Sequence, residues 1–112
     1  MLAPGDLTQE SDLPALGEAA DGLRTSFHYS VSHDSPENKK FVSAFKAYAK
    51  KTGLPGGDKR VTDDPMEAAY FGVYVWKQAV EKAKSTEGDA VRKAVYGQEF
   101  LAPGGKIKMD EA

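Results

Sequence analysis

Two histidines and a small set of carboxylates are the residues of this 112-residue chain that could take part in chemistry. His28 and His33 lie close together, and Asp63, Asp64 and Glu67 follow further along. A histidine beside a carboxylate can transfer protons or bind a metal ion. The spacing favours neither role, because no third ligand lies at a zinc-binding interval, no nucleophile elbow is present, and two adjacent aspartates do not make a catalytic pair. The sequence therefore predicts no metal, no cofactor and no catalysis.

His28 lies on the polar side of an alternating segment, residues 22–30. Apolar and polar side chains follow one another here with the two-residue period of a half-buried strand, so we expect a strand over this segment. On the polar side of a strand, a histidine is more often solvated or hydrogen-bonded than catalytic, and we favour that interpretation. The opposite side consists of Leu23, Thr25, Phe27 and Tyr29.

Residues 62–84 predict a long central helix that would position the carboxylates. Asp64 can serve as its N-terminal cap, Pro65 suits the first helical position, and Glu67 lies three residues after the cap, as in a capping box. Residues 68–76 carry no charge, so we expect the first half of this helix to be buried on more than one side. Spacings of four and three predict one inward face made of Ala69, Val73, Trp76, Val80 and Ala83.

A second helix is expected over residues 35–51. Ser35 is followed by proline and glutamate, which is the same type of helix start, and Gly53 is a typical stop. The lysines of this helix could form an anion-binding patch. A solvated helix face is the favoured interpretation, because the chain as a whole is slightly acidic.

The last part of the chain predicts a short helix and a strand. The helix is expected over residues 87–96, with its start at Ser85 or Thr86. After a turn at residues 103–105, residues 106–109 alternate like a short strand. At the other end, residues 1–21 are polar and interrupted by proline and glycine, so we interpret them as a loop or connector.

Composition excludes several classes of protein. The chain has room for one small domain, with 40% hydrophobic and 29% charged residues. A net charge of −2 does not indicate the basic surface that binds nucleic acid, and no apolar run is long enough to span a membrane. There is no cysteine, and the N-terminus lacks the pattern of a secretory signal peptide.

A resemblance rests on four stretches of the sequence, which are Pro36–Val42, Asp64–Tyr70, Val75–Ala83 and Ala102–Asp110. Together they resemble a known family, the type I periplasmic solute-binding proteins of ABC transporters. The resemblance is strongest to receptors for urea and short-chain amides, with residues 12–17 more similar to amino-acid-binding relatives. It implies an α/β fold of two lobes joined by crossovers, with the ligand held between the lobes.

The resemblance implies that this chain is a fragment of that fold, with three helices and two or three short strands. Residues 22–112 would form a partial solute-binding domain, comprising one lobe crossover and helices of the first lobe. The parent protein would be periplasmic, and it would capture urea, a short-chain amide or an amino acid and deliver it to a membrane permease. It would not be an enzyme.

The resemblance also suggests ligand contacts at the end of the first strand and the start of the central helix. The matching residues are Tyr29, Asp64, Glu67 and Tyr70. Each also has a purely structural interpretation, the carboxylates as a capping box and the tyrosines as core aromatics.

A different class of function remains open at this point. The chain could be a stand-alone small α/β module that acts through protein contacts and self-associates without catalysis. The receptor fragment and the stand-alone module differ in what covers the central helix. A fragment leaves part of that helix exposed, because the segment that packs on it is missing.

Overall fold

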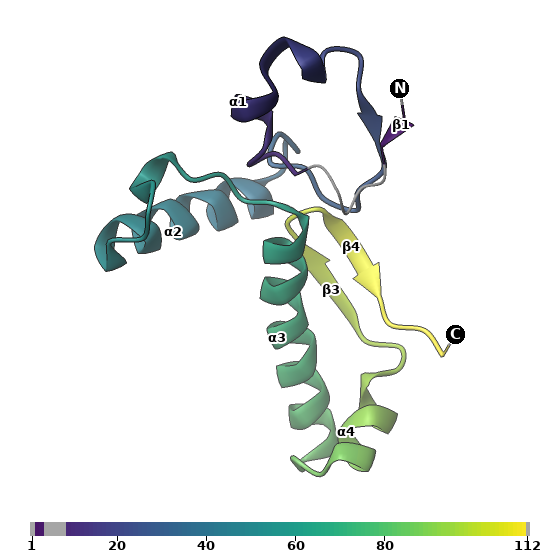
Figure 1. The fold of residues 1–112 in the computed structure, drawn as a ribbon. Helices are drawn as coiled ribbons and strands as arrows, with labels where there is room; N and C mark the ends of the chain where they lie inside the picture. Colours follow the sequence, from purple (N-terminus) through teal and green to yellow (C-terminus); the bar gives the residue numbers. More distant parts are fainter. Residues whose placement is uncertain (1, 4–8, 112) are drawn as a thin grey trace.

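A computed structural model describes residues 2–3 and 9–111 (Figure 1). The long helices α2 and α3 diverge from a junction near the middle of the molecule, and a hairpin runs beside α3 toward α4 (Figure 1). No helix in the described part is long and apolar enough to cross a membrane. In chain order the elements are β1 (Leu2–Ala3), α1 (Leu13–Leu16), the 3-10 helix η2 (Gly17–Ala20), β2 (Arg24–Thr25), α2 (Pro36–Thr52), the 3-10 helix η3 (Gly57–Lys59), α3 (Asp64–Ala83), α4 (Gly88–Val95), β3 (Glu99–Ala102) and β4 (Gly105–Lys108).

Helix α2 begins and ends as its sequence predicts. The Ser35 hydroxyl accepts a hydrogen bond from the backbone N–H of Asn38 at 3.1 Å, and proline occupies the first turn. Gly53 ends the helix with a left-handed backbone, φ 66°, which a residue without a side chain adopts without strain.

The cap of α3 is Asp63, and the prediction of Asp64 as cap is wrong. Asp63 has an extended backbone, and its carboxylate accepts from the N–H of Met66 at 3.1 Å. Asp64 is already helical, and its carboxylate contacts another segment. The predicted capping box of Asp64 and Glu67 is also absent. Both oxygens of the Glu67 carboxylate bind groups outside the helix instead.

The inward face of α3 also differs from the prediction in its first half. Val73 is 65% exposed and Trp76 is 53% exposed, whereas Val75 and Ala79 are buried. Residues 68–76 are apolar on nearly every side of the helix, so their periodicity does not select one face. A side other than the predicted one is therefore buried. In the second half the prediction is closer, since α4 covers that end with the cluster of Ala79, Val80, Ala83, Val91, Ala94 and Val95.

Helix α4 lies within the predicted range, but neither Ser85 nor Thr86 caps it. The cap position is Glu87, whose side chain makes no capping hydrogen bond. The Ser85 hydroxyl instead accepts from the N–H of Glu87, so it stabilises the turn before the helix.

Strands β3 and β4 form an antiparallel hairpin in which Phe100 pairs with Ile107. The short strand expected near residues 106–109 is therefore confirmed as β4, one residue earlier, whereas β3 was not predicted as a strand. Lys106 lies 2.7 Å from Glu99 across the hairpin and holds the pKa of that carboxyl below its ordinary value.

The predicted strand over residues 22–30 is reduced to β2, two residues long, paired in parallel with β1. Beyond β2, no described strand lies beside the segment, and the N–H of Tyr29 is satisfied by the Asp64 carboxylate. The expected alternation is partly kept, because Tyr29 is buried and Phe27 half-buried while Thr25 is exposed. This segment joins the N-terminal elements to α2 and passes the start of α3.

Candidate functional site

The His28 ring lies between two carboxylates at the start of α3. Its Nδ1 is 2.8 Å from Asp64 Oδ1, and its Nε2 is 3.1 Å from Glu67 Oε2. A carboxylate accepts the hydrogen bond from whichever ring nitrogen carries a proton. The ring also meets Phe71 edge-on, with centroids 6.0 Å apart. His28 is thus a hydrogen-bonded histidine, the interpretation that the sequence favoured.

The Glu67 carboxylate joins three segments of the chain. It is 1% exposed, and its second oxygen accepts from the N–H of Gly104, in the turn between β3 and β4, at 3.0 Å. The turn lies so close to the chain at His28 that a Cβ on Gly104 would be 2.8 Å from the His28 carbonyl oxygen. Asp64 adds a second link, because its Oδ1 also accepts from the N–H of Tyr29 at 3.1 Å.

The Tyr29 hydroxyl is part of a buried polar network. It donates to Asn38 Oδ1 at 2.8 Å and lies 2.6 Å from the Thr62 hydroxyl, and all three residues are buried. Burial raises the pKa of Tyr29, and the hydrogen bond with Thr62 offsets part of this effect. The Asn38 amide donates to the backbone carbonyls of Val31 and His33, so it fixes the loop that follows Tyr29.

Tyr70, the fourth predicted ligand residue, lies apart from the other three. Its ring packs against Phe41 at 4.8 Å and Tyr74 at 4.9 Å between centroids, and Tyr74 stacks on Phe100. Burial, and then the neighbouring Tyr74 hydroxyl, raise the pKa of Tyr70. The structure therefore brings together Tyr29, Asp64 and Glu67 around His28 and places Tyr70 in an aromatic row.

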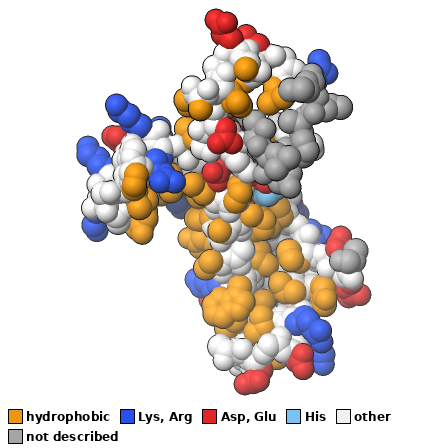
Figure 2. All heavy atoms as spheres, in the orientation of Figure 1, with side chains coloured by type: hydrophobic (Ala, Val, Ile, Leu, Met, Phe, Trp, Pro, Cys, Tyr) orange, Lys and Arg blue, Asp and Glu red, His pale blue; other side chains and the backbone are white. Residues whose placement is uncertain are grey.

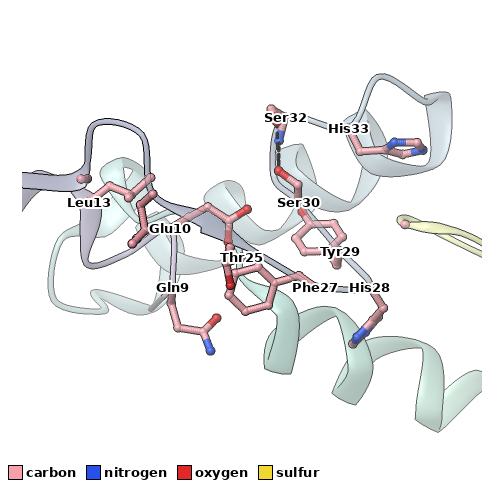
Figure 3. Close-up of a pocket in the computed structure, with 13 residues that line it drawn as sticks. Gln9, Glu10, Leu13, Thr25, Phe27, His28, Tyr29, Ser30, Ser32 and His33 are labelled. Atoms are coloured by element: carbon pink, nitrogen blue, oxygen red, sulfur yellow. Dashed lines mark hydrogen bonds between the residues drawn. The ribbon is translucent and has the colours of Figure 1, made fainter. Parts of the chain in front are cut away.

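A cavity of about 580 Å³ lies beside this junction, between the N-terminal segment and residues 23–33 (Figure 3). That volume falls within the usual range for small-molecule sites. Glu10 anchors one wall, since its Oε1 accepts from the N–H of Val31 at 2.9 Å. The rest of the lining mixes the hydroxyls of Thr25, Ser30 and Ser32 with the apolar side chains of Leu13, Ala20, Leu23 and Phe27.

Sequence reasoning did not identify most of these cavity residues. Glu10 lies in a segment interpreted as a connector, and no motif marks Thr25 or Ser30. Ser30 alone had a signal, because the alternation of residues 22–30 placed its side chain on the polar side. In the described residues, no group of three or more His, Cys, Asp or Glu side chains is arranged to hold a metal ion.

A comparison with protein families matches residues 7–112 to the periplasmic binding protein domain. Among curated proteins, the chain is 46% identical over 112 residues to the Leu/Ile/Val-binding protein homolog 6 of Brucella abortus and of Brucella suis. The match covers 98% of this chain and 27% of each relative. The chain thus spans about a quarter of the length of these relatives.

Solved structures with the same arrangement are solute-binding proteins of ABC transporters from Rhodopseudomonas palustris. One, from strain HaA2 in complex with p-hydroxybenzoic acid, has a TM-score of 0.79 and 34% identity over 97% of this chain. Another, from strain BisB5 in complex with 3,4-dihydroxybenzoic acid, has a TM-score of 0.80 and 30% identity. This chain covers 28% of each. The relatives are solute-binding proteins and not enzymes, in agreement with the prediction.

Proposed function

The chain belongs to the periplasmic binding protein family, and we propose that, as part of a longer ABC-transporter receptor, it helps to capture a small polar solute for uptake. Its α/β fold corresponds to a portion of the type I periplasmic binding protein fold. The full-length receptor would reside in the periplasm and deliver its solute to a membrane permease. The observation that carries this proposal is the close structural match, over 97% of the chain, to solute-binding proteins with bound ligand.

An amino acid is the first candidate for the solute, followed by a short-chain amide or urea. The name of the curated relatives supports an amino acid, whereas urea and amides rest on the resemblance of residues 64–70 and 102–110. Glu10 also supports this choice, because a carboxylate accepts hydrogen bonds from the ammonium or amide groups of these solutes. The solved relatives add a small aromatic acid to the set that must be tested.

We propose that Tyr29, Asp64 and Glu67 serve the ligand site by positioning it. Asp64 accepts a hydrogen bond from the N–H of Tyr29, Glu67 contacts His28, and the Tyr29 hydroxyl contacts Thr62. These contacts hold the wall formed by residues 25–32 against α3. The cavity beside Glu10 would then be this chain's share of the ligand site. Tyr70 is a separate proposal, a direct ligand contact in the full-length receptor, and its replacement by phenylalanine tests it.

A chimera tests the proposal. The matching region of the Brucella relative is replaced by residues 1–112, and calorimetry measures binding of leucine, acetamide, urea and 4-hydroxybenzoate. We expect saturable binding of at least one solute, weakened by Glu10→Gln and unchanged by Glu37→Gln, a half-buried acid on α2 that does not line the cavity. A chimera that folds cooperatively and binds none of the four would contradict the proposed function.

A self-associating stand-alone module is the second candidate. The observation in its favour is the row of exposed apolar side chains on α3. This candidate requires a discrete oligomer of the 112-residue chain that stays assembled on dilution to nanomolar concentration and is unaffected by any solute.

A further inference from the structure

The Glu10 carboxylate has one oxygen without a hydrogen-bond donor. Its Oε1 accepts from the N–H of Val31, which fixes the direction of the group. Its Oε2 is buried and has no hydrogen-bond partner among the described residues. A buried carboxylate oxygen without a donor costs free energy, so native sites normally supply one. Because Glu10 lines the cavity of about 580 Å³, a bound molecule can supply that donor.

The segment that carries Glu10 is acidic throughout. Residues 1–23 contain five acidic residues and no lysine, arginine or histidine. In the space-filling view, acidic side chains lie over the N-terminal elements at the top of the molecule, and Lys and Arg side chains gather over α2 (Figure 2). Gln9 adds a second acceptor to this wall, because its Oε1 is also buried without a hydrogen-bond partner in the described part of the chain. This wall therefore favours a cation over an anion.

The cavity groups that could bind an anion are mostly engaged elsewhere. Both ring nitrogens of His28 face carboxylates at the start of α3, at 2.8 and 3.1 Å. The His33 ring points away from Glu10 (Figure 3). The hydroxyls of Ser30 and Ser32 lie 2.9 Å apart and bind each other. The described lining contains no lysine or arginine that could pair with a carboxylate on a solute.

The apolar part of the lining suits an aliphatic chain. Leu13, Ala20, Leu23 and Phe27 contribute side chains without hydrogen-bonding groups. Burying a short alkyl chain against them removes apolar surface from water, which is favourable. The cavity thus combines an acidic acceptor with apolar side chains. That combination suits an alkylammonium group, whose charged end needs acceptors and whose chain needs none.

We propose that this cavity binds the alkylammonium end of a solute, which donates to Glu10 Oε2, and that it rejects a carboxylate in the same place. The inference rests on the proposed function, because it specifies which end of the solute this portion of the receptor recognises. It distinguishes the chain from its solved relatives in complex with p-hydroxybenzoic acid and 3,4-dihydroxybenzoic acid, both of which are carboxylic acids.

Two solutes of matched shape test the inference in the Brucella chimera. Isopentylamine is leucine without its carboxylate, and isocaproate is leucine without its amino group. We expect calorimetry to show that the amine binds at least about tenfold more tightly than the acid, the usual effect of one hydrogen bond to a charged group. An acid that binds as tightly as the amine, or more tightly, would overturn the inference.

Glu10→Gln separates recognition of the solute from support of the wall. The glutamine keeps an oxygen for the N–H of Val31 and places an NH₂ group at the position of Oε2, so an acceptor becomes a donor. We expect isopentylamine to bind at least about tenfold more weakly to this variant, with isocaproate binding unchanged or tighter. Glu37→Gln, the matched control outside the cavity, should change neither.

Two outcomes of the variant experiment would contradict the inference. Equal losses for the amine and the acid, or no loss for the amine, would assign Glu10 a purely structural role and overturn the inference while leaving the proposed function intact. A cooperatively folded parent chimera that binds neither these two solutes nor those of the earlier calorimetry would refute the proposed function itself.

Discussion

The capping hydrogen bond of α3 comes from Asp63, and its loss should weaken the helix start. We expect Asp63→Ala to lower the free energy of unfolding by about 0.5–2 kcal/mol, the usual effect of losing a cap. Asp63→Ser keeps a side-chain oxygen at the cap position, so it should retain most of the free energy of unfolding that Asp63→Ala loses. Urea denaturation measures both, and equal midpoints for the parent chain and Asp63→Ala would show that the cap contributes nothing.

The Tyr29 hydroxyl binds two buried partners, so its removal should be costly. We expect Tyr29→Phe to lower the free energy of unfolding by roughly 1–3 kcal/mol, because Asn38 Oδ1 and the Thr62 hydroxyl both lose a partner away from water. Tyr48→Phe is the matched control, since that tyrosine is 59% exposed. A loss no larger than that of the control would contradict the network.

The same tyrosine should make stability depend on alkaline pH. Burial raises the pKa of Tyr29 above its ordinary value of 10.0. A group whose pKa is raised on folding contributes stability that is complete below the unfolded value and is lost as pH rises through the folded value. Melting temperatures from about pH 8 to about pH 11 should therefore fall less steeply for Tyr29→Phe than for the parent chain. Parallel pH profiles would contradict this assignment.

The hairpin docks on α3 through Gly104, where the structure leaves no space for a side chain. We expect Gly104→Ala to destabilise the chain by about 1–3 kcal/mol, because its Cβ would lie 2.8 Å from a backbone oxygen. Gly72→Ala, where the space is open, should instead stabilise it by about 0.5–1 kcal/mol. Thermal melts of the two variants should therefore shift in opposite directions, and shifts of the same sign would refute the packing argument.

At the scale of elements, the sequence predicted the features that depend only on neighbouring residues, such as the ends of a helix. Ser35 and Gly53 mark both ends of α2, because a cap and a left-handed stop depend only on neighbouring residues. The inward face of α3 was not predictable, since its first half is apolar on nearly every side and distant contacts choose which side packs. The strand over residues 22–30 failed for a related reason, because a strand needs a neighbour that the sequence of the segment does not reveal.

The candidate site was predictable only in part. Asp64 and Glu67 were placed correctly at the start of α3, since a helix start is legible in sequence, and the structure brings both to His28. That pairing joins residues more than 35 positions apart, and no sequence pattern encodes it. Glu10 and the hydroxyls of the cavity come from irregular segments, where periodicity gives no information.

At the scale of the whole molecule, the chain by itself should bind solutes poorly. In the proposed receptor the ligand site would be shared with chain outside residues 1–112, and ordering an incomplete site during binding subtracts from affinity. Calorimetry of the 112-residue chain with leucine, acetamide and urea should show no saturable heat at micromolar solute. A micromolar site that disappears in Tyr70→Ala would contradict this expectation and would favour Tyr70 as a ligand residue.

The central claim is that these 112 residues form a portion of a longer solute-binding protein, in which the exposed apolar side chains of α3 need further chain to cover them. Burying a large apolar side chain contributes roughly 1.5–3 kcal/mol, so the isolated chain should cover Val73 and Trp76 by associating as its concentration rises. Light scattering across a dilution series, read together with Trp76 fluorescence, is the direct measurement. We predict concentration-dependent association with a blue shift of Trp76 emission. A monomer at every concentration, with Trp76 buried and a cooperative melt, would contradict the claim.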